Sequence, residues 1–255
     1  MSPPLFWVDE VPAAGTEAEL SGPEGRHAVT VTRIGAGETI LLGDGRGASA
    51  TCEVVGTRGK DALRARALEY RFVDRPKPQV TLVQALPKSE RSELVVELAT
   101  EAGVDVIVPW QSSRSVARWV GSKADKGVAK WRATAAAAAK QSRRAWIPEV
   151  TDLASMTDVR ARCADVLDGG GRVVALHESG RDAFGGIDFR SAPGVVLVVG
   201  PEGGLSDEEL ADLAALGAQV CVLGPQVLRT STAGAVALGA LGVLTDRWDL
   251  PGGRS

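Results

Sequence analysis

The sequence contains few of the residues that cross-link chains or bind metals. It has three cysteines, Cys52, Cys163 and Cys221, and two histidines, His27 and His177. Because the cysteines are odd in number and far apart, they fit neither a disulfide framework nor the spacing of a zinc site. We therefore expect no metal site and a reducing, cytoplasmic setting.

Long apolar runs are also missing. The longest apolar stretch, residues 233–244, is too short and too rich in glycine to span a bilayer. The N-terminal residues lack an apolar run with a basic start, so we expect no secretory signal and no membrane partner. Hydrophobic residues make up 44% of the 255 positions, which is enough for one large domain or two smaller ones.

The net charge of −3 by itself argues against a nucleic-acid binder. The distribution of charge points the other way, because residues 111–147 contain nine basic residues and one acidic residue, Asp125. Such a run can be a solvated helical face. Solvated faces normally mix both signs, so the single sign favours a surface that binds phosphates.

Residues 195–233 organise the rest of the chain. Two short apolar runs, residues 195–199 and 220–223, each end in Gly-Pro, as buried parallel strands followed by loops would. Between them Ser206 can cap a helix, and Glu209 completes a capping box. Ligands bind beyond the carboxyl ends of strands in an open α/β sheet. Both glycine loops are therefore predicted to line one site.

The chemistry of these loops is only partly specified. The first loop, with Gly200, Gly203 and Gly204, is neither a Walker A motif nor GxGxxG. A nucleotide hydrolase is therefore disfavoured, and a tight turn before a capped helix explains the glycines equally well. The second loop, residues 223–232, is too long for a minimal turn, and it sets Arg229 and three hydroxyl groups just before a helix.

The remaining pattern predicts two domains. Residues 1–73 read as a small all-β barrel with strands at 5–8, 28–34, 38–42, 49–55 and 63–73. The last strand changes phase after Ala67, which indicates a bulge. Residues 74–78, with two prolines, form a linker. Residues 79–255 alternate strands near 80, 104, 173, 195 and 219 with helices at 89–102 (capped by Ser89), 124–142 and 232–248, an α/β class with a parallel sheet.

A resemblance to a known family covers nearly the whole chain. Gly200-Pro201-Glu202-Gly203-Gly204, Leu223-Gly224-Pro225 and Leu228-Arg229-Thr230 resemble the bacterial 16S ribosomal RNA (uracil-N3)-methyltransferases of the SPOUT superfamily. The resemblance implies a PUA-like RNA-binding barrel in residues 1–73. It also implies a SPOUT domain in residues 79–255, with a trefoil knot at its C-terminal end, and a homodimer.

The resemblance further implies S-adenosylmethionine as cofactor and a uridine N3 in the 16S ribosomal RNA of the small subunit as the target. The implied cofactor-binding residues are Leu176, Gly200, Glu202, Gly203, Leu223, Gly224, Val227 and Leu228. The implied RNA-binding residues are Arg26, Arg33, Arg114, Arg143 and Arg144. In the barrel, Arg64, Arg66 and Arg71 are further candidates for RNA contacts. For any one of the barrel arginines, an ordinary exposed strand position is the alternative.

The predicted catalytic residues are Arg229, Thr230 and Ser231. Arg229 would stabilise the negative charge that appears on the uracil oxygens when N3 loses its proton, and Thr230 or Ser231 would hold the base. Arg229 could equally bind a phosphate or the cofactor carboxylate. Ser231 stands where the family pattern has glutamate, so the role of that acid is not transferred, and no general base is identified. Neither His27 nor His177 is favoured as the base.

Two other functions remain open from the sequence. One is a knotted methyltransferase that acts on a ribose 2′-OH. The other is a non-catalytic RNA-binding or ribosome-assembly factor that retains the fold, which the serine at position 231 makes conceivable.

Overall fold

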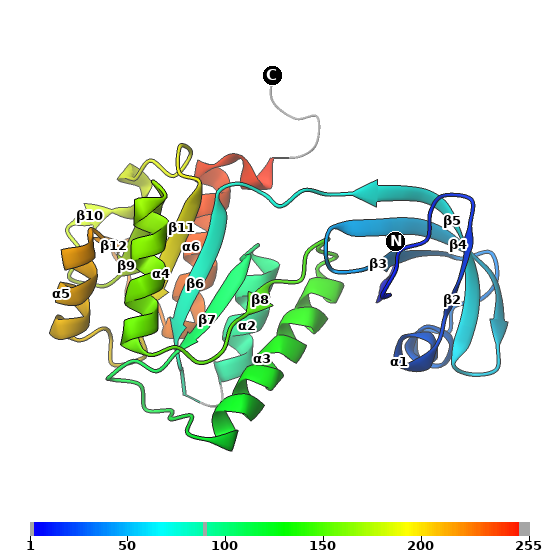
Figure 1. Ribbon diagram of the computed structural model, residues 1–255, viewed down its shortest axis with the longest axis horizontal. Helices are drawn as coiled ribbons and strands as arrows, with labels where there is room; N and C mark the ends of the chain where they lie inside the picture. Colours follow the sequence, from blue (N-terminus) through cyan, green and yellow to red (C-terminus); the bar gives the residue numbers. More distant parts are fainter. Residues whose placement is uncertain (1–2, 89–90, 250–255) are drawn as a thin grey trace. The chain divides into compact units, whose positions relative to one another are not determined.

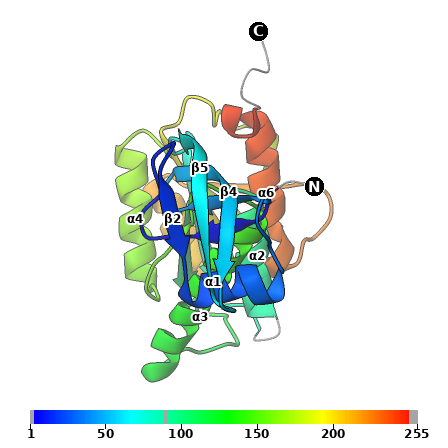
Figure 2. The ribbon, with the colours of Figure 1, turned by 90° about the vertical axis from the view of Figure 1, so that its right-hand side faces the viewer.

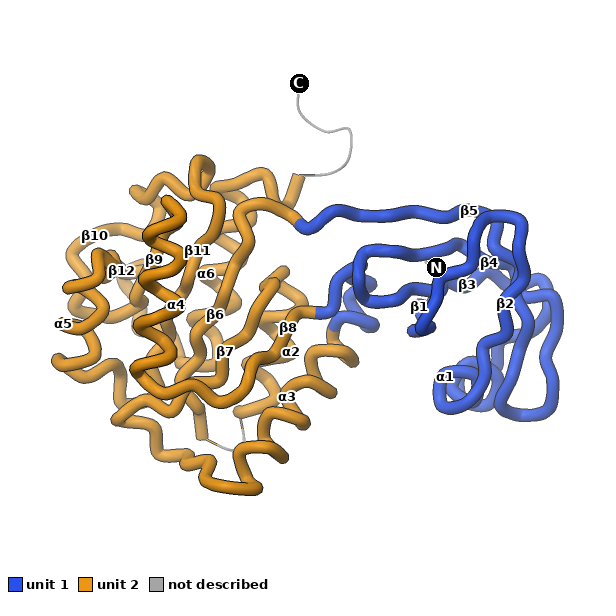
Figure 3. Tube along the Cα trace, viewed as in Figure 1, with its two compact units in different colours: residues 1–75, 139–147 blue, residues 76–138, 148–255 orange. Residues whose placement is uncertain are grey.

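The computed structural model describes residues 3–88 and 91–249. It divides into two compact units (Figure 3): the first contains the residues up to 75 together with 139–147, and the second contains the rest. Each unit has its own hydrophobic core. The return of residues 139–147 to the first unit was not predicted from the sequence.

The first unit is built on a five-stranded sheet with the order β1-β3-β4-β5-β2. Its strands are β1 (Leu5–Trp7), β2 (Glu17–Leu20), β3 (Thr39–Gly43), β4 (Ala48–Arg58) and β5 (Ala62–Phe72). The β1–β3 pair is parallel and the other pairs are antiparallel. Two helical turns, α1 (Gly22–Arg26) and the π-helix η1 (His27–Val31), complete the unit. Its core includes Phe6, Ile40, Leu42 and Leu63.

The strand predicted for residues 28–34 is wrong, because this segment is the π-helix η1 and the turn after it. Its valines and threonines imitate a period of two, but Ala28 and Ile34 are buried whereas Val31 is 67% exposed. Gly25 explains how the preceding turn docks. A Cβ atom at Gly25 would lie only 2.7 Å from the carbonyl oxygen of Leu20. The glycine therefore lets α1 lie close to the sheet, and the helical turns continue from α1 directly into η1.

The predicted bulge in β5 is confirmed. Thr51 of β4 pairs with Glu69, and the next residue, Cys52, pairs with Ala67. Leu68 is thus the extra residue, and it is exposed whereas Ala67 faces the core. The bulge reverses the alternation of side chains along β5. Ala67 therefore faces the core, whereas Glu69 and Arg71 point to the outer face.

The second unit contains a seven-stranded sheet with the order β10-β12-β9-β11-β6-β7-β8, in which every pair is parallel (Figure 1). The strands are β6 (Gln79–Ala85), β7 (Val106–Trp110), β8 (Glu149–Val150), β9 (Arg172–Leu176), β10 (Asp182–Ala183), β11 (Gly194–Val199) and β12 (Gln219–Val222). The predicted parallel α/β class is confirmed. The short edge strands β8 and β10 were not predicted.

Helices cover both faces of this sheet, with α4 and α6 on opposite sides (Figure 2). The helices are α2 (Ser92–Glu101), α3 (Ser122–Gln141), α4 (Met156–Asp168), α5 (Asp207–Leu216) and α6 (Thr230–Leu244), with 3₁₀ turns at Phe184–Gly186 and Asp246–Trp248. The predicted cap Ser89 lies outside the described residues. None of the helices within the described ranges has the length and apolar character needed to cross a bilayer.

A buried ion pair fastens the chain after α6. The Arg247 guanidinium lies 2.9 Å from the Asp105 carboxylate, and their side chains are only 5% and 1% exposed. Arg247 also donates to the carbonyl oxygens of Pro78 and Gly103. The same Asp105 oxygen accepts a hydrogen bond from the Val80 amide at 2.8 Å. The 3₁₀ turn at Asp246–Trp248 is thereby tied to the start of β6 and to the turn before β7.

We predict that Arg247→Ala lowers the free energy of unfolding by about 3–5 kcal/mol, because it leaves the Asp105 carboxylate buried without its cation. The matched control is Arg190→Ala, which removes an exposed ion pair with Asp246 and should change stability by less than about 1 kcal/mol. Urea denaturation of both variants measures the difference. Equal losses of stability in the two variants would show that the buried ion pair contributes no more than the exposed one.

Candidate active site

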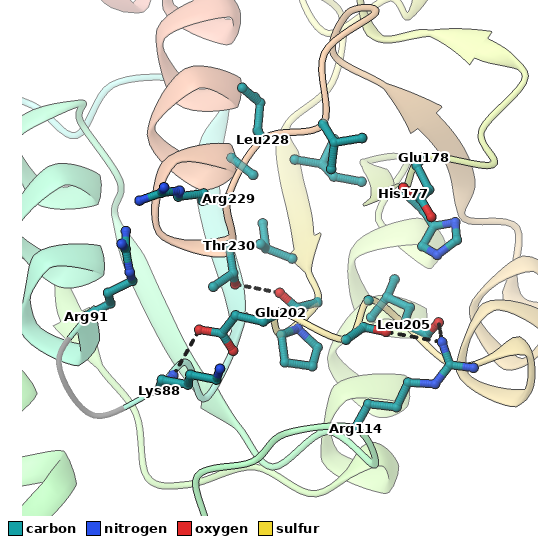
Figure 4. Close-up of a pocket in the computed structure, with 18 of the residues that line it drawn as sticks. Lys88, Arg91, Arg114, His177, Glu178, Glu202, Leu205, Leu228, Arg229 and Thr230 are labelled. Carbon is teal, nitrogen blue, oxygen red and sulfur yellow. Dashed lines mark hydrogen bonds between the residues drawn. The ribbon is translucent and has the colours of Figure 1, made fainter.

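Five loops meet at the carboxyl edge of the parallel sheet, as the strand directions require. They follow β6, β7, β9, β11 and β12, and together they line a cavity of about 670 Å³ (Figure 4). A smaller cavity of about 180 Å³ between the β9 and β12 loops shares Leu176, His177, Val227 and Leu228 with it. The volume of the larger cavity is in the range of known cofactor-binding sites.

The loop after β11 is tight and ends in a capped helix. A Cβ atom at Gly200 would lie 2.9 Å from the amide nitrogen of Leu205, and Gly204 has a φ of +70°, so both positions favour glycine. The predicted capping box is confirmed. The Ser206 hydroxyl accepts from the Glu209 amide, and the Glu209 carboxylate accepts from the Ser206 amide at 2.9 Å.

Glu209 also bonds to the loop after β7, which the sequence did not indicate. Its buried carboxylate accepts hydrogen bonds from the Ser113 amide at 2.8 Å and the Ser112 hydroxyl at 3.4 Å. Arg114 then donates to the carbonyl oxygens of Gly203 and Leu205, at 3.2 and 3.0 Å. The loop after β7 is therefore fixed against the loop after β11, and the Arg114 guanidinium already has partners in the wall.

Thr230 joins the two glycine loops. Its hydroxyl donates to the carbonyl oxygen of Gly200 at 2.5 Å and accepts from the Gln84 side-chain amide at 3.1 Å (Figure 4). The hydroxyl hydrogen of Thr230 is thus used in a hydrogen bond within the protein. Ser231 is buried and its hydroxyl accepts from Arg91 at 3.4 Å. Of the three predicted catalytic residues, these two serve the architecture of the site.

Arg229 differs from its neighbours. Its side chain is exposed at the start of α6, and it makes no hydrogen bond or ion pair with the residues that the structure describes. Figure 4 shows it on the same side of the cavity as Arg91. Glu202, in contrast, accepts a hydrogen bond from the Lys88 amide at 3.0 Å. Among the predicted catalytic residues, Arg229 alone presents its functional group to the cavity without such a bond.

His177 places a donor on the cavity wall. Its Nδ1 atom accepts from the Ser179 amide at 3.2 Å and lies 2.7 Å from the Ser179 hydroxyl. Because Nδ1 is an acceptor, the neutral ring carries its hydrogen on Nε2. Nε2 lies beside Gly204, so close that a Cβ atom there would be 3.5 Å away. A neutral ring in this form has an N–H group at Nε2 that can donate a hydrogen bond.

All eight predicted cofactor-binding residues line the two cavities. Lys88, Arg91 and Glu178 line them as well and were not among the predicted site residues. The buried Gln84 was also not predicted as a site residue. A polar side chain within the apolar strand β6 was a sequence feature that could have indicated it. Burial and, to a smaller extent, the Asp182 charge raise the pKa of the Cys221 thiol beside the smaller cavity, which keeps it protonated.

The predicted RNA-binding residues divide between the units. Arg114 lines the large cavity, whereas Arg26, Arg33, Arg143 and Arg144 belong to the first unit. The basic segment 111–147 is likewise divided, and several of its charges have acidic partners. Lys130 pairs with Glu93, Arg132 with Asp152 and Lys140 with Glu24. These three charges of the segment therefore have acidic partners within the protein.

Comparison with known proteins identifies the class. Residues 74–242 match the family model of the RNA methyltransferase domain, and residues 20–68 match that of the RNA methyltransferase PUA domain. The fold and the cavity at the sheet edge are therefore those of an RNA methyltransferase with a PUA domain.

Relatives narrow the assignment. Ribosomal RNA small subunit methyltransferase E of Mycobacterium bovis is 51% identical, with 96% of this chain and 93% of the relative covered. The Bacillus subtilis protein of the same name is 32% identical over 89% and 90%. The crystal structure of that methyltransferase from Neisseria gonorrhoeae, bound to S-adenosyl methionine, superimposes with a TM-score of 0.84 at 26% identity, covering 96% and 98%. The chain belongs to the ribosomal RNA small subunit methyltransferase E family.

We predict that Glu209→Ala lowers the free energy of unfolding by about 2–3 kcal/mol, because donors from Ser112, Ser113 and Ser206 lose their buried acceptor. The control Glu208→Ala removes the exposed neighbouring carboxylate in the same helical turn and should change stability by less than about 0.5 kcal/mol. Thermal and urea denaturation report both. A Glu209 variant as stable as the control would show that the bridge between the loops is not needed.

Proposed function

We propose that the protein transfers a methyl group from S-adenosylmethionine to N3 of a uridine in 16S ribosomal RNA. The observation that carries this proposal is the cavity at the carboxyl edge of the sheet, built from both glycine loops, in a chain 51% identical to a ribosomal RNA small subunit methyltransferase. We further propose that the target is read within the small ribosomal subunit, in the cytoplasm.

The residues of the cavity suit this cofactor. Leu176, Leu223 and Leu228 supply apolar walls for a flat base. The side chain of Val227 beside them is 78% exposed, and a ligand in the cavity would cover it. Gly200, Gly203 and Gly224 line the cavities with backbone groups alone, and Glu202 provides a carboxylate. The bound cofactor supplies a methyl group already activated by its sulfonium.

The role of this chain is then to position the base and to favour loss of its N3 proton. That loss places negative charge on the flanking carbonyl oxygens, and a nearby cation stabilises it. Arg229 fits this role because its guanidinium has no partner among the described residues. Thr230 is a positioning residue that holds the loops together, and Ser231 stabilises the start of α6 through Arg91. Arg114 positions the loop that bounds the cavity.

RNA binding is assigned to the first unit together with Arg114. Arg26 and Arg33 are exposed, and Arg143 and Arg144 line a concave surface of the first unit. We also propose a homodimer. Val236 and Val243 on α6 are 42% and 73% exposed, and Leu94 on the adjacent α2 is 40% exposed, an apolar face suited to a second copy. The trefoil knot stays a prediction.

The decisive experiment is methyl transfer from labelled S-adenosylmethionine to unmodified small ribosomal subunits, with naked RNA in parallel, followed by nucleoside analysis. Label in 3-methyluridine supports the proposal. Label in a 2′-O-methylated nucleoside would replace it with ribose methylation. Absence of both label and cofactor binding would leave a non-catalytic RNA-binding factor.

We predict that Arg229→Ala reduces kcat by about 10²-fold or more while the Kd for S-adenosylmethionine changes less than about threefold, as expected for a donor used at the transition state. Single-turnover methylation and calorimetry measure the two quantities. Arg160→Ala, which removes an exposed charge paired with Asp212 on the α4–α5 face, is the control. A large loss of cofactor affinity would instead assign Arg229 to the cofactor carboxylate.

A further inference from the structure

The outer face of the sheet in the first unit carries an ordered row of side chains. Trp7, Gly43, Ser49 and Arg71 are consecutive cross-strand partners on β1, β3, β4 and β5. The next row, Leu5, Leu41, Thr51 and Glu69, runs beside it. Both rows line a cavity of about 250 Å³. The bulge at Leu68 brings Glu69 and Arg71 to this face, away from the core.

The segment that returns from the end of α3 closes this cavity. Its residues Arg143, Arg144 and Ala145 line the cavity together with the two rows. The segment is held by backbone bonds, from the Gly47 amide to the Ala145 carbonyl at 3.0 Å and from the Ile147 amide to the Gly45 carbonyl at 2.9 Å. The Trp146 indole adds a hydrogen bond to the Val73 carbonyl at 2.7 Å. The cavity therefore has a fixed wall.

Arg143 occupies an unusual backbone position in that wall. The Arg143 amide bonds the Lys140 carbonyl and the Arg144 amide bonds the Ala139 carbonyl, the two bonds of a Schellman motif at the end of α3. The φ of Arg143 is 55°, in the left-handed region where glycine is normally found. A side chain kept where glycine would fold more easily points to a role outside folding.

The chemistry of the cavity suits one nucleotide. The charged residues that line the cavity are Arg71, Arg143, Arg144 and Glu69, so the lining has a net positive charge and favours an anion. Gly43 lets the Trp7 ring lie close against β3, since a Cβ atom at Gly43 would come within 3.2 Å of that ring. An aromatic side chain next to a bare glycine, with a hydroxyl from Ser49 adjacent, is suited to an unstacked base.

We propose that this cavity is a subsite for one unstacked nucleotide of single-stranded RNA, with its phosphate at Arg71, Arg143 and Arg144 and its base beside Trp7. The inference rests on the proposed RNA substrate and adds to it a second contact point, separate from the methyl-transfer cavity. A single-stranded stretch is favoured over a duplex because a concave cavity of this size admits one splayed nucleotide and no paired helix.

The test is binding of a fluorescent single-stranded oligouridylate to the full-length protein, measured by anisotropy at several salt concentrations. Arg143→Gly and Arg71→Ala should each weaken binding about tenfold and reduce the salt slope by about 0.7, the value for one lost phosphate contact on a single strand. Arg58→Ala removes an exposed arginine of β4 that pairs with Glu19 and should leave the slope unchanged. Arg143→Gly should keep its melting temperature, because glycine suits the left-handed position.

Two controls separate this proposal from the proposed function. Cofactor binding should be the same in the wild type, Arg143→Gly and Arg71→Ala, because the methyl-transfer cavity is untouched. If Arg143→Gly and Arg71→Ala bind the oligonucleotide as Arg58→Ala does, or if duplex RNA shows the same dependence on Arg143, the subsite is wrong even where methylation of small subunits is intact. If oligonucleotide binding depends on Arg71 and Arg143 in a protein that methylates no RNA, the subsite stands and the proposed function fails.

Discussion

The hydroxyl group of Thr230 is the point on which the geometry of the active site depends. It donates to the Gly200 carbonyl in the loop after β11 and accepts from the Gln84 amide in β6, so it joins the start of α6 to two strands of the sheet. Glycine-rich loops have little stiffness of their own. A buried amide without a partner is costly, and the Gln84 bond therefore favours one arrangement of these three elements over alternatives.

The wall of the cavity is held in the same manner. Glu209 bridges its own helix cap to the loop after β7, and Arg114 returns from that loop to the carbonyl oxygens of Gly203 and Leu205. Charged groups that could have been assigned to a ligand are thus satisfied by the protein. Arg229 is different, and this contrast is what makes it a candidate for work on the substrate. Charge in a cavity is informative only after the internal partners have been accounted for.

In the first unit, one extra residue and one returning segment create a surface that the strands alone lack. The bulge at Leu68 changes which side chains of β5 face outward. Residues 143–147, about seventy positions further along the chain, then pack on the β3–β4 turn through Gly45 and Gly47. Trp146 lies edge-on to Phe72, under the guanidinium of Arg75, and closes this corner.

The sequence by itself determined the elements whose signals are local. The parallel strands, the Ser206–Glu209 capping box, the bulge after Ala67 and the placement of both glycine loops at one edge follow from periodicity, caps and strand direction. The tertiary structure decided the helical turns at residues 22–31, where the alternation predicted a strand over residues 28–34. It also decided that Thr230 and Glu209 connect loops, and that residues 139–147 join the first unit. These features depend on partners distant in the chain, and a pairing of that kind leaves no repeat or spacing in the sequence.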